Sequence, residues 1–365
     1  MLKYFFAFIM LIHGLIHFMG FAKAFNYGYI SQLTKYISKP AGSLWLITAI
    51  LFVVAVMLFL LKKESWPYIA IVAAIISQIL IITVWKDAKF GTISNIIILF
   101  VAISSLASYR FERTFKEDVK RHIADTDFSK NELLTESDIV SLPIPIQNYI
   151  RYTGAINKPK VKNMKVVFDG EMRDRGKDFF KFTSAQYNFF DDPTRLFFMK
   201  AKMYGAPVPG YHCYQNEHAT MQIKLLGLFN VVNIKGTEMN KAETVTVFND
   251  MCLMAPAALI DKRIEWTTID SLSAKAIFTN GINKISATLY FNELGQLINF
   301  ISDDRYAIGD MKQYRFSTPV KDYIQIDGRN MMQYGETIWH YPDGEFVYGK
   351  FNLKSIEYNV TDYKK

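Results

Sequence analysis

The sequence has very little cysteine. Cys213 and Cys252 are the only two in 365 residues. This number excludes a disulfide-built scaffold and a zinc site made of four cysteines. The two thiols could pair, but cysteines in a large domain are commonly buried and unreactive, so we expect free thiols in the core.

Familiar catalytic signatures are also missing. The sequence has no Gly-x-Ser-x-Gly nucleophile elbow, no phosphate-binding Gly-rich loop ending in Lys-Ser/Thr, and no His-Glu-x-x-His zinc motif. An enzyme therefore ranks behind a binding protein among the functions that the sequence predicts.

Four stretches in the first third of the chain lack any charged residue. They are residues 4–22, 44–61, 67–85 and 90–109. Because a bilayer core about 30 Å thick requires about 20 apolar residues in a helix, we expect residues 1–109 to form four transmembrane helices. The links between the last three stretches are so short that these helices must be antiparallel neighbours. The first stretch has no small-x-small cleavage site, which favours a retained helix over a signal peptide.

Positive charge is concentrated in the predicted membrane part. Residues 1–109 carry eight Lys, no Arg and two acids, a net charge of +6, whereas the rest of the chain contributes only +2 to the total of +8. A nearly balanced soluble part argues against a nucleic-acid partner, because such a partner requires a dense positive face. The bilayer itself is the partner that the composition predicts.

The distribution of Lys and Arg predicts the orientation in the membrane. Eight of these residues flank the predicted helices on the side of both termini, and five lie on the opposite side. Because Lys and Arg are enriched in cytoplasmic loops, we expect a multi-pass protein of the cell membrane with its soluble domain in the cytoplasm.

The remainder of the chain divides into a linker, residues 110–141, and a β-rich domain, residues 142–365. Phe111, Phe115, Val119 and Ile123 recur every four residues among charges, which indicates an amphipathic helix. A short helix is expected near 143–152, between prolines and a glycine.

Short aromatic and β-branched runs follow from residue 164, separated by turn signals such as Asn280-Gly281 and Asp327-Gly328. One segment, Lys241–Ile260, is typical of a helix that Pro256 restarts. The expected fold is a four-helix transmembrane bundle followed by an α+β domain. In that domain, a curved antiparallel sheet, a half-barrel, packs one or two helices on its concave side.

Several motifs carry a family resemblance. Residues 141–154, Gly170-Glu-Met-Arg173, residues 254–260 leading to Ile264-Glu-Trp266, and Asp303-Asp-Arg-Tyr306 resemble the spaced motifs of an uncharacterised bacterial family, a domain of unknown function, of membrane-anchored β-rich proteins. The resemblance covers about residues 140–360 and implies no activity. A looser similarity of strand order is to the half-barrel of lipoprotein carriers and related lipid-binding proteins, and fold alone does not give function.

Two histidines stand out in the first predicted transmembrane helix. His13 and His17 lie four residues apart, so their rings share one side of the helix, and ionisable groups in a bilayer are costly enough to suggest a role. They are candidates for a haem or metal site. The other predicted spans offer no His, Cys or acid, so hydrogen bonds to Ser, Gln or Asn on neighbouring helices are the favoured interpretation, and we predict no metal and no cofactor.

Three further groups are candidates in the β-rich domain. Asp303 and Asp304 with Arg305 could form an acid pair oriented by an arginine, as in hydrolases. His212, Cys213 and His218 are close in sequence, but strand alternation directs Cys213 away from the two histidines. Aromatic side chains on successive strands could form a concave surface for an apolar ligand. The residues expected to bind the ligand are Phe180, Phe182, Tyr187 and Phe197.

Three functional hypotheses follow. The first is a membrane-tethered module that is not an enzyme and whose curved sheet binds lipid or another apolar ligand. The second is an enzyme acting on a membrane-associated substrate, with Asp303, Asp304 and Arg305 as the residues to test. The third is a haem- or metal-binding membrane bundle based on His13 and His17. The sequence does not indicate a protein partner or an oligomeric state.

Overall fold

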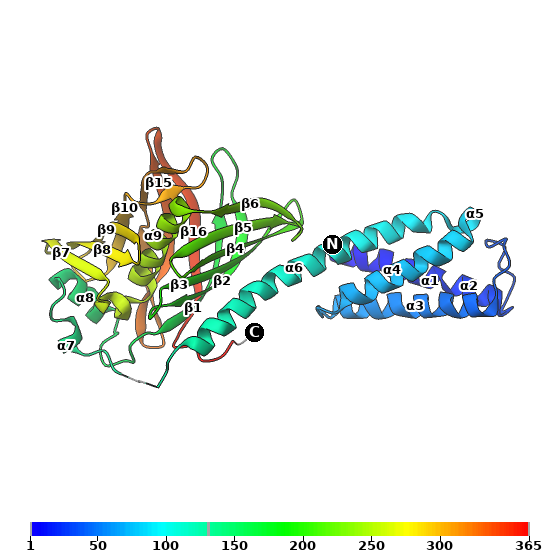
Figure 1. Cartoon of the computed structure of the whole chain (residues 1–365), viewed down its shortest axis with the longest axis horizontal. Helices are drawn as coiled ribbons and strands as arrows, with labels where there is room; N and C mark the ends of the chain where they lie inside the picture. The colour runs from blue at the N-terminus through cyan, green and yellow to red at the C-terminus, as the bar shows by residue number, and fades with distance from the viewer. Residues whose placement is uncertain (1, 130–131, 364–365) are drawn as a thin grey trace. The chain divides into compact units, whose positions relative to one another are not determined.

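The computed structural model describes residues 2–129 and 132–363 (Figure 1). Within these residues the chain forms two compact units. The first runs from the N-terminus to Phe111 and includes Leu226–Leu228, and the second comprises Glu112–Leu225 and the chain from Phe229 onward. Each unit is described separately.

Among the described residues, four helical segments are long and apolar enough to cross a membrane, and they lie in the first unit except for the C-terminal part of the last one. They are α1 (Leu2–Ile16) with α2 (Phe18–Ala24), α3 (Lys39–Leu60), α4 (Trp66–Thr83), and α6 (Gly91–Asp125), and the short α5 (Trp85–Ala88) precedes α6. Small residues such as Ala49, Ala70 and Ala74 are fully buried, whereas Ile75 and Ile79 are exposed. Small side chains inside and large apolar ones outside are typical of helices that pack in lipid. The prediction of four apolar helices is confirmed.

Helix α6 is longer than the fourth predicted span. The span and the amphipathic segment after it form one continuous helix, because no glycine or proline interrupts the residues between them. The C-terminal part of α6 lies in the second unit, where Phe115, Val119 and Ile123 are buried. The Phe115 ring packs against Tyr187, Phe198 and Tyr211 of three neighbouring strands.

The second unit is built on one large antiparallel sheet. Its strand order is β6-β5-β4-β3-β2-β1-β16-β15-β13-β10-β9-β8-β7, with β14 paired to β15, and β11 and β12 form a separate pair. The strands are β1 (Asn163–Met172), β2 (Phe180–Phe189), β3 (Thr194–Met203), β4 (Ala206–Gln215), β5 (His218–Leu225), β6 (Phe229–Lys235), β7 (Ile264–Asp270), β8 (Ser273–Asn280), β9 (Asn283–Phe291), β10 (Leu297–Ser302), β11 (Tyr306–Ala307), β12 (Lys312–Gln313), β13 (Arg315–Ser317), β14 (Val320–Ile326), β15 (Arg329–Tyr341) and β16 (Gly344–Tyr358).

The predicted turn signals coincide with tight hairpins. Asn280-Gly281 lies at the β8–β9 turn, and Asp327-Gly328 joins β14 to β15. Asp327 and Gly328 both have positive φ, 49° and 69°, as a two-residue hairpin of the primed type requires. The predicted short helix is α8 (Ile144–Tyr152), preceded by α7 (Glu136–Ile139).

One long helix occupies the concave side of the sheet. The predicted helical segment forms α9 (Thr237–Met254), and Pro256 begins the 3-10 turn η1 (Pro256–Ile260). Helix α9 contacts strands near both ends of the sheet, among them β5 and β9, so the sheet curves around it (Figure 1). Most α9 side chains are buried, on every face of the helix. The second unit is therefore an α+β half-barrel, as predicted, and its end strands β6 and β7 do not pair with each other in the described chain.

Candidate functional site

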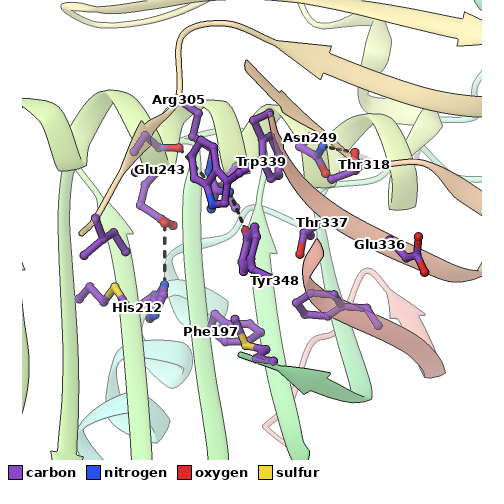
Figure 2. A pocket seen from close by; sticks show the side chains of 18 of the residues that line it. Phe197, His212, Glu243, Asn249, Arg305, Thr318, Glu336, Thr337, Trp339 and Tyr348 are labelled. Carbon is purple, nitrogen blue, oxygen red and sulfur yellow. Dashed lines mark hydrogen bonds and ion pairs between the residues drawn. The ribbon is translucent and has the colours of Figure 1, made fainter. Parts of the chain in front are cut away.

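A cavity of about 570 Å³ lies between the concave face of the sheet and α9. Its volume falls within the range of about 300–1,000 Å³ that is typical of small-molecule sites. Figure 2 shows this concave cavity from close by. Its lining includes Phe168, Met172, Phe180, Arg195, Phe197, Met199, His212 and Met221 from the first strands, Met239, Glu243, Thr246 and Asp250 from α9, and Arg305, Phe316, Thr337, Trp339, Tyr348 and Phe351 from the later part of the chain.

Most of the wall is apolar because alternate residues of each strand face the same side of the sheet. On β3, Phe197 and Met199 face the cavity, while Phe198 between them packs against Phe115 on the opposite face. The many methionines make the wall adaptable, since their unbranched side chains fill irregular space.

A buried charge cluster stands at one part of the wall. Arg195 of β3 donates from Nε to Asp250 Oδ2 (2.7 Å) and from Nη1 to Glu243 Oε2 (3.2 Å), both on α9. Gln186 and Asn188 of β2 donate to the same Asp250 oxygen at 2.7 and 3.2 Å. Each charge is thus paired and hydrogen-bonded, as a buried charge requires.

The two acids of this cluster respond differently to their environment. Burial disfavours the charge of Glu243, but Arg195, the nearby His212 and the charge of Arg305 outweigh it and bring the pKa of Glu243 down to about 2. His212 Nδ1 lies 3.8 Å from Glu243 Oε1 (Figure 2). Burial raises the pKa of Asp250, against the opposing effect of Arg195. The acid next to His212 is therefore the more firmly ionised of the two.

Arg305 occupies a different environment in the same cavity. Its guanidinium carbon lies 4.1 Å from the centre of the Phe316 ring and 5.1 Å from that of Trp339. Its Nη1 donates to the Tyr348 hydroxyl at 2.6 Å (Figure 2). Within the described residues, no carboxylate lies within ion-pair distance of this guanidinium.

The structure separates the predicted acid pair from this cavity. Asp303 is exposed and pairs with Arg315 at 2.9 Å. Asp304 accepts hydrogen bonds from the backbone and hydroxyl of Ser286 and pairs with Lys241 at 3.0 Å. Only Arg305 of the three lines the cavity. The three neighbouring residues therefore do not meet at one site.

The predicted aromatic residues divide between the two faces of the sheet. Phe180 and Phe197 line the cavity. Phe182 lies on the same face, where it packs against Phe197 and the Phe351 ring. Tyr187 contacts Phe115 on the opposite face and is separated from the cavity by the sheet.

The two histidines of the first unit form a polar network across helices. His13 Nε2 lies 3.1 Å from Ser77 Oγ and 2.9 Å from Asn95 Oδ1, and His17 Nε2 lies 2.9 Å from the same Ser77 oxygen. Asn95 also donates to Gln78 (3.1 Å). Ser, Gln and Asn are the hydrogen-bond partners that the favoured interpretation predicted for His13 and His17.

The remaining candidates do not converge. His212 faces the cavity, whereas Cys213 is on the other face and His218 lies beside Asn240. Among the residues that the structure describes, no three His, Cys, Asp or Glu side chains cluster as metal ligands. Cys213 and Cys252 are both buried and free.

Comparison with protein families gives one match, over residues 132–351, which is more than half of the chain. The chain belongs to the DUF6544 family. This is a family of unknown function, in agreement with the predicted resemblance. No curated protein matches the chain.

Among solved structures, one that is similar is the crystal structure of a LolA superfamily protein from Nitrosomonas europaea. The identity is 8% and the TM-score 0.33, and the match covers 58% of this chain and 93% of that one. This agrees with the looser similarity to lipoprotein carriers, and a likeness at this level carries no argument about function.

Sequence reasoning missed the charge cluster on the cavity wall. Asp250 interrupts the apolar face of α9, and Arg195 opens the strand run Leu-Phe-Phe-Met. A charged residue inside an otherwise apolar segment must be paired when it is buried, and this pattern could have identified both Arg195 and Asp250.

Proposed function

We propose that this protein is a membrane-anchored binding module whose concave cavity takes up a lipid or another amphiphilic molecule. The observation that carries the proposal is the cavity itself, about 570 Å³ in volume, at the centre of the half-barrel where a closed core would otherwise be packed. A protein interior normally leaves few voids larger than a water molecule, so a cavity of this size with aromatic and methionine walls supports an apolar ligand.

The four apolar helices support a role at a membrane. A module tethered beside a bilayer meets lipid-derived ligands at a high effective concentration without additional contacts. The bias of Lys and Arg in the sequence favours a cytoplasmic location for this module.

The orientation is tested with a cysteine on the surface. Because Cys213 and Cys252 are both buried, Glu293→Cys at an exposed turn of the β-rich unit introduces a single accessible thiol. A maleimide that cannot cross membranes should label this variant only after the cells are lysed. Labelling in intact cells to the same extent would place the module outside the cytoplasm.

Ligand uptake is tested with a neutral photoreactive fatty alcohol that carries a diazirine in its chain. The full-length protein is reconstituted in nanodiscs, irradiated with the probe, digested, and the labelled peptides are identified by mass spectrometry. We expect adducts on the β3 and α9 peptides that line the cavity, in addition to adducts on the membrane helices. The latter serve as an internal measure of probe in the bilayer.

Thr246 on α9 offers a matched pair of variants. Its side chain lines the cavity and is partly exposed to it. Thr246→Trp should fill part of the cavity and reduce labelling of β3, because the indole and the ligand would occupy the same space. Thr246→Val keeps the volume and should label like the natural protein. Labelling confined to the membrane helices in all three proteins would refute the proposed function.

A further inference from the structure

Arg305 brings a positive charge into a mostly apolar cavity. Its charge acts on Glu243, but among the described residues no acid lies within ion-pair distance of its guanidinium. Glu243, one of the acids that line the cavity, is held by Arg195 at 3.2 Å and faces His212 at 3.8 Å. It lies beyond ion-pair distance from Arg305 within the described chain. Three further acids line the cavity. Asp250 accepts three N–H donors at a single oxygen, Glu336 accepts a hydrogen bond from the Tyr334 hydroxyl, and Asp174 forms no ion pair with Arg305 in the described residues. None of the four acids that line the cavity is therefore an ion-pair partner of Arg305 in the described residues.

The guanidinium of Arg305 is positioned by aromatic rings. Phe316, Trp339 and Tyr348 surround it, with ring centres 4.1, 5.1 and 5.8 Å from its central carbon. Such rings attract a cation to their negative faces, and Arg305 is only partly exposed. A charge with little water around it interacts more strongly with an incoming anion than a solvated charge does.

The hydrogen-bonding capacity of Arg305 is largely unused. One N–H group donates to Tyr348, and its buried Nε finds no acceptor in the described residues. The buried hydroxyl of Thr337, which also lines the cavity, has no partner either. Unpaired buried polar atoms are a cost to the protein, and an anionic group bound at the same guanidinium offsets the cost of its charge.

We propose that the ligand of the concave cavity is an amphiphile with an anionic head, a carboxylate or a phosphate, and that Arg305 binds this head while the methionine and aromatic wall holds the chain. A guanidinium can donate two parallel hydrogen bonds to either head group. The inference rests on the proposed function and adds the class of ligand to it.

The test uses the full-length protein in nanodiscs and the neutral photoreactive alcohol as reporter, at about pH 8, where carboxylates are ionised. Four competitors separate charge from chain. Oleate and lysophosphatidate carry both, oleyl alcohol has the chain alone, and inorganic phosphate has the charge alone. The measured quantity is the competitor concentration that halves the labelling of the β3 peptide.

At least one of the two anionic amphiphiles should halve the labelling of β3 at a concentration about tenfold lower than that required of oleyl alcohol. This advantage in concentration is the one expected for a charge-assisted hydrogen bond. Arg305→Gln should remove this advantage and leave protection by oleyl alcohol unchanged, which also shows that the variant folds. Arg305→Lys keeps the charge and should retain part of the advantage. Arg315→Gln is the matched control, because it removes an arginine that is exposed and paired with Asp303 outside the cavity.

Equal protection by oleyl alcohol and both anionic amphiphiles would overturn the inference and leave the proposed function intact. So would an advantage that survives in Arg305→Gln. Protection by inorganic phosphate as strong as that by oleate would identify a site for a free anion and likewise overturn it. Absence of any cavity labelling by the reporter would instead remove the proposed function, and the inference with it.

Discussion

Arg195 and Asp250 connect the sheet to the helix that it surrounds. The Nε atom of Arg195 on β3 lies 2.7 Å from Oδ2 of Asp250 on α9, and both side chains are buried. Replacing a buried pair by apolar residues can be neutral, but removal of one partner leaves a charge that neither water nor protein neutralises. The position of α9 on the cavity wall therefore depends on this contact.

Arg195→Met should strongly destabilise the β-rich unit, because it leaves Glu243 and Asp250 buried without their counter-charge. The expected loss is about 3–5 kcal/mol in the free energy of unfolding. Chemical denaturation of the full-length protein, followed by near-ultraviolet circular dichroism, measures it. The control, Arg315→Met, removes an exposed pair with Asp303 and should cost less than about 1 kcal/mol. Equal losses in the two variants would contradict this account of the cluster.

Glu243 should make stability depend on acidic pH. Its pKa in the folded protein is about 2, below the ordinary value of 4.5. Its contribution is therefore complete above about pH 4.5 and is lost as the pH falls toward 2. The contribution is on the order of 3 kcal/mol, and Asp250, whose pKa is raised, offsets part of it. Melting temperatures between pH 7 and 3 should fall less steeply in Glu243→Gln, and superimposable profiles would count against the assignment.

Phe115 should be the main contact of α6 with the convex face of the sheet. It is buried against Tyr187, Phe198 and Tyr211. Phe115→Ala should cost about 3–5 kcal/mol, as large-to-small changes of a buried aromatic residue do. Glu117→Ala on the exposed face of the same helix should change the free energy of unfolding by less than about 0.5 kcal/mol. Hydrogen exchange of residues 112–125 measures the loss of packing directly.

Ser77 should stabilise the helical bundle through one shared oxygen. His13, His17 and Asn95 all contact its Oγ at 2.9–3.1 Å. Ser77→Ala should lower the stability of the bundle by about 1 kcal/mol, the size of interhelical hydrogen bonds in membranes. Thermal unfolding in detergent measures the effect, with the exposed Ser43→Ala as the control. A Soret absorption band that disappears in His13→Ala would instead support the haem-binding alternative.

Local patterns in the sequence were sufficient for much of the fold. The absence of charge over about 20 residues is enough to identify an apolar helix, because the cost of charge in lipid acts on each segment by itself. The hairpin at Asp327-Gly328 is equally local, since the positive φ that it requires favours these residue types.

The candidate site was predicted only in part. Strand alternation alone could have separated Tyr187 from Phe180 and Phe182, because odd and even positions face opposite sides of a sheet. It does not say which side is concave. The proximity of Asp303, Asp304 and Arg305 was misleading as a guide to a common site, because neighbouring residues at the end of a strand point in different directions.

The sequence by itself determined the apolar helices, the turns and the strand-rich character of the second unit, because each depends on interactions within a few residues. Only the tertiary structure decided that Arg305 lies among Phe316, Trp339 and Tyr348, and that Arg195 meets two acids of α9. These contacts join residues up to 55 positions apart. They exist because the sheet curves around one helix, and that curvature is a property of all its strands together.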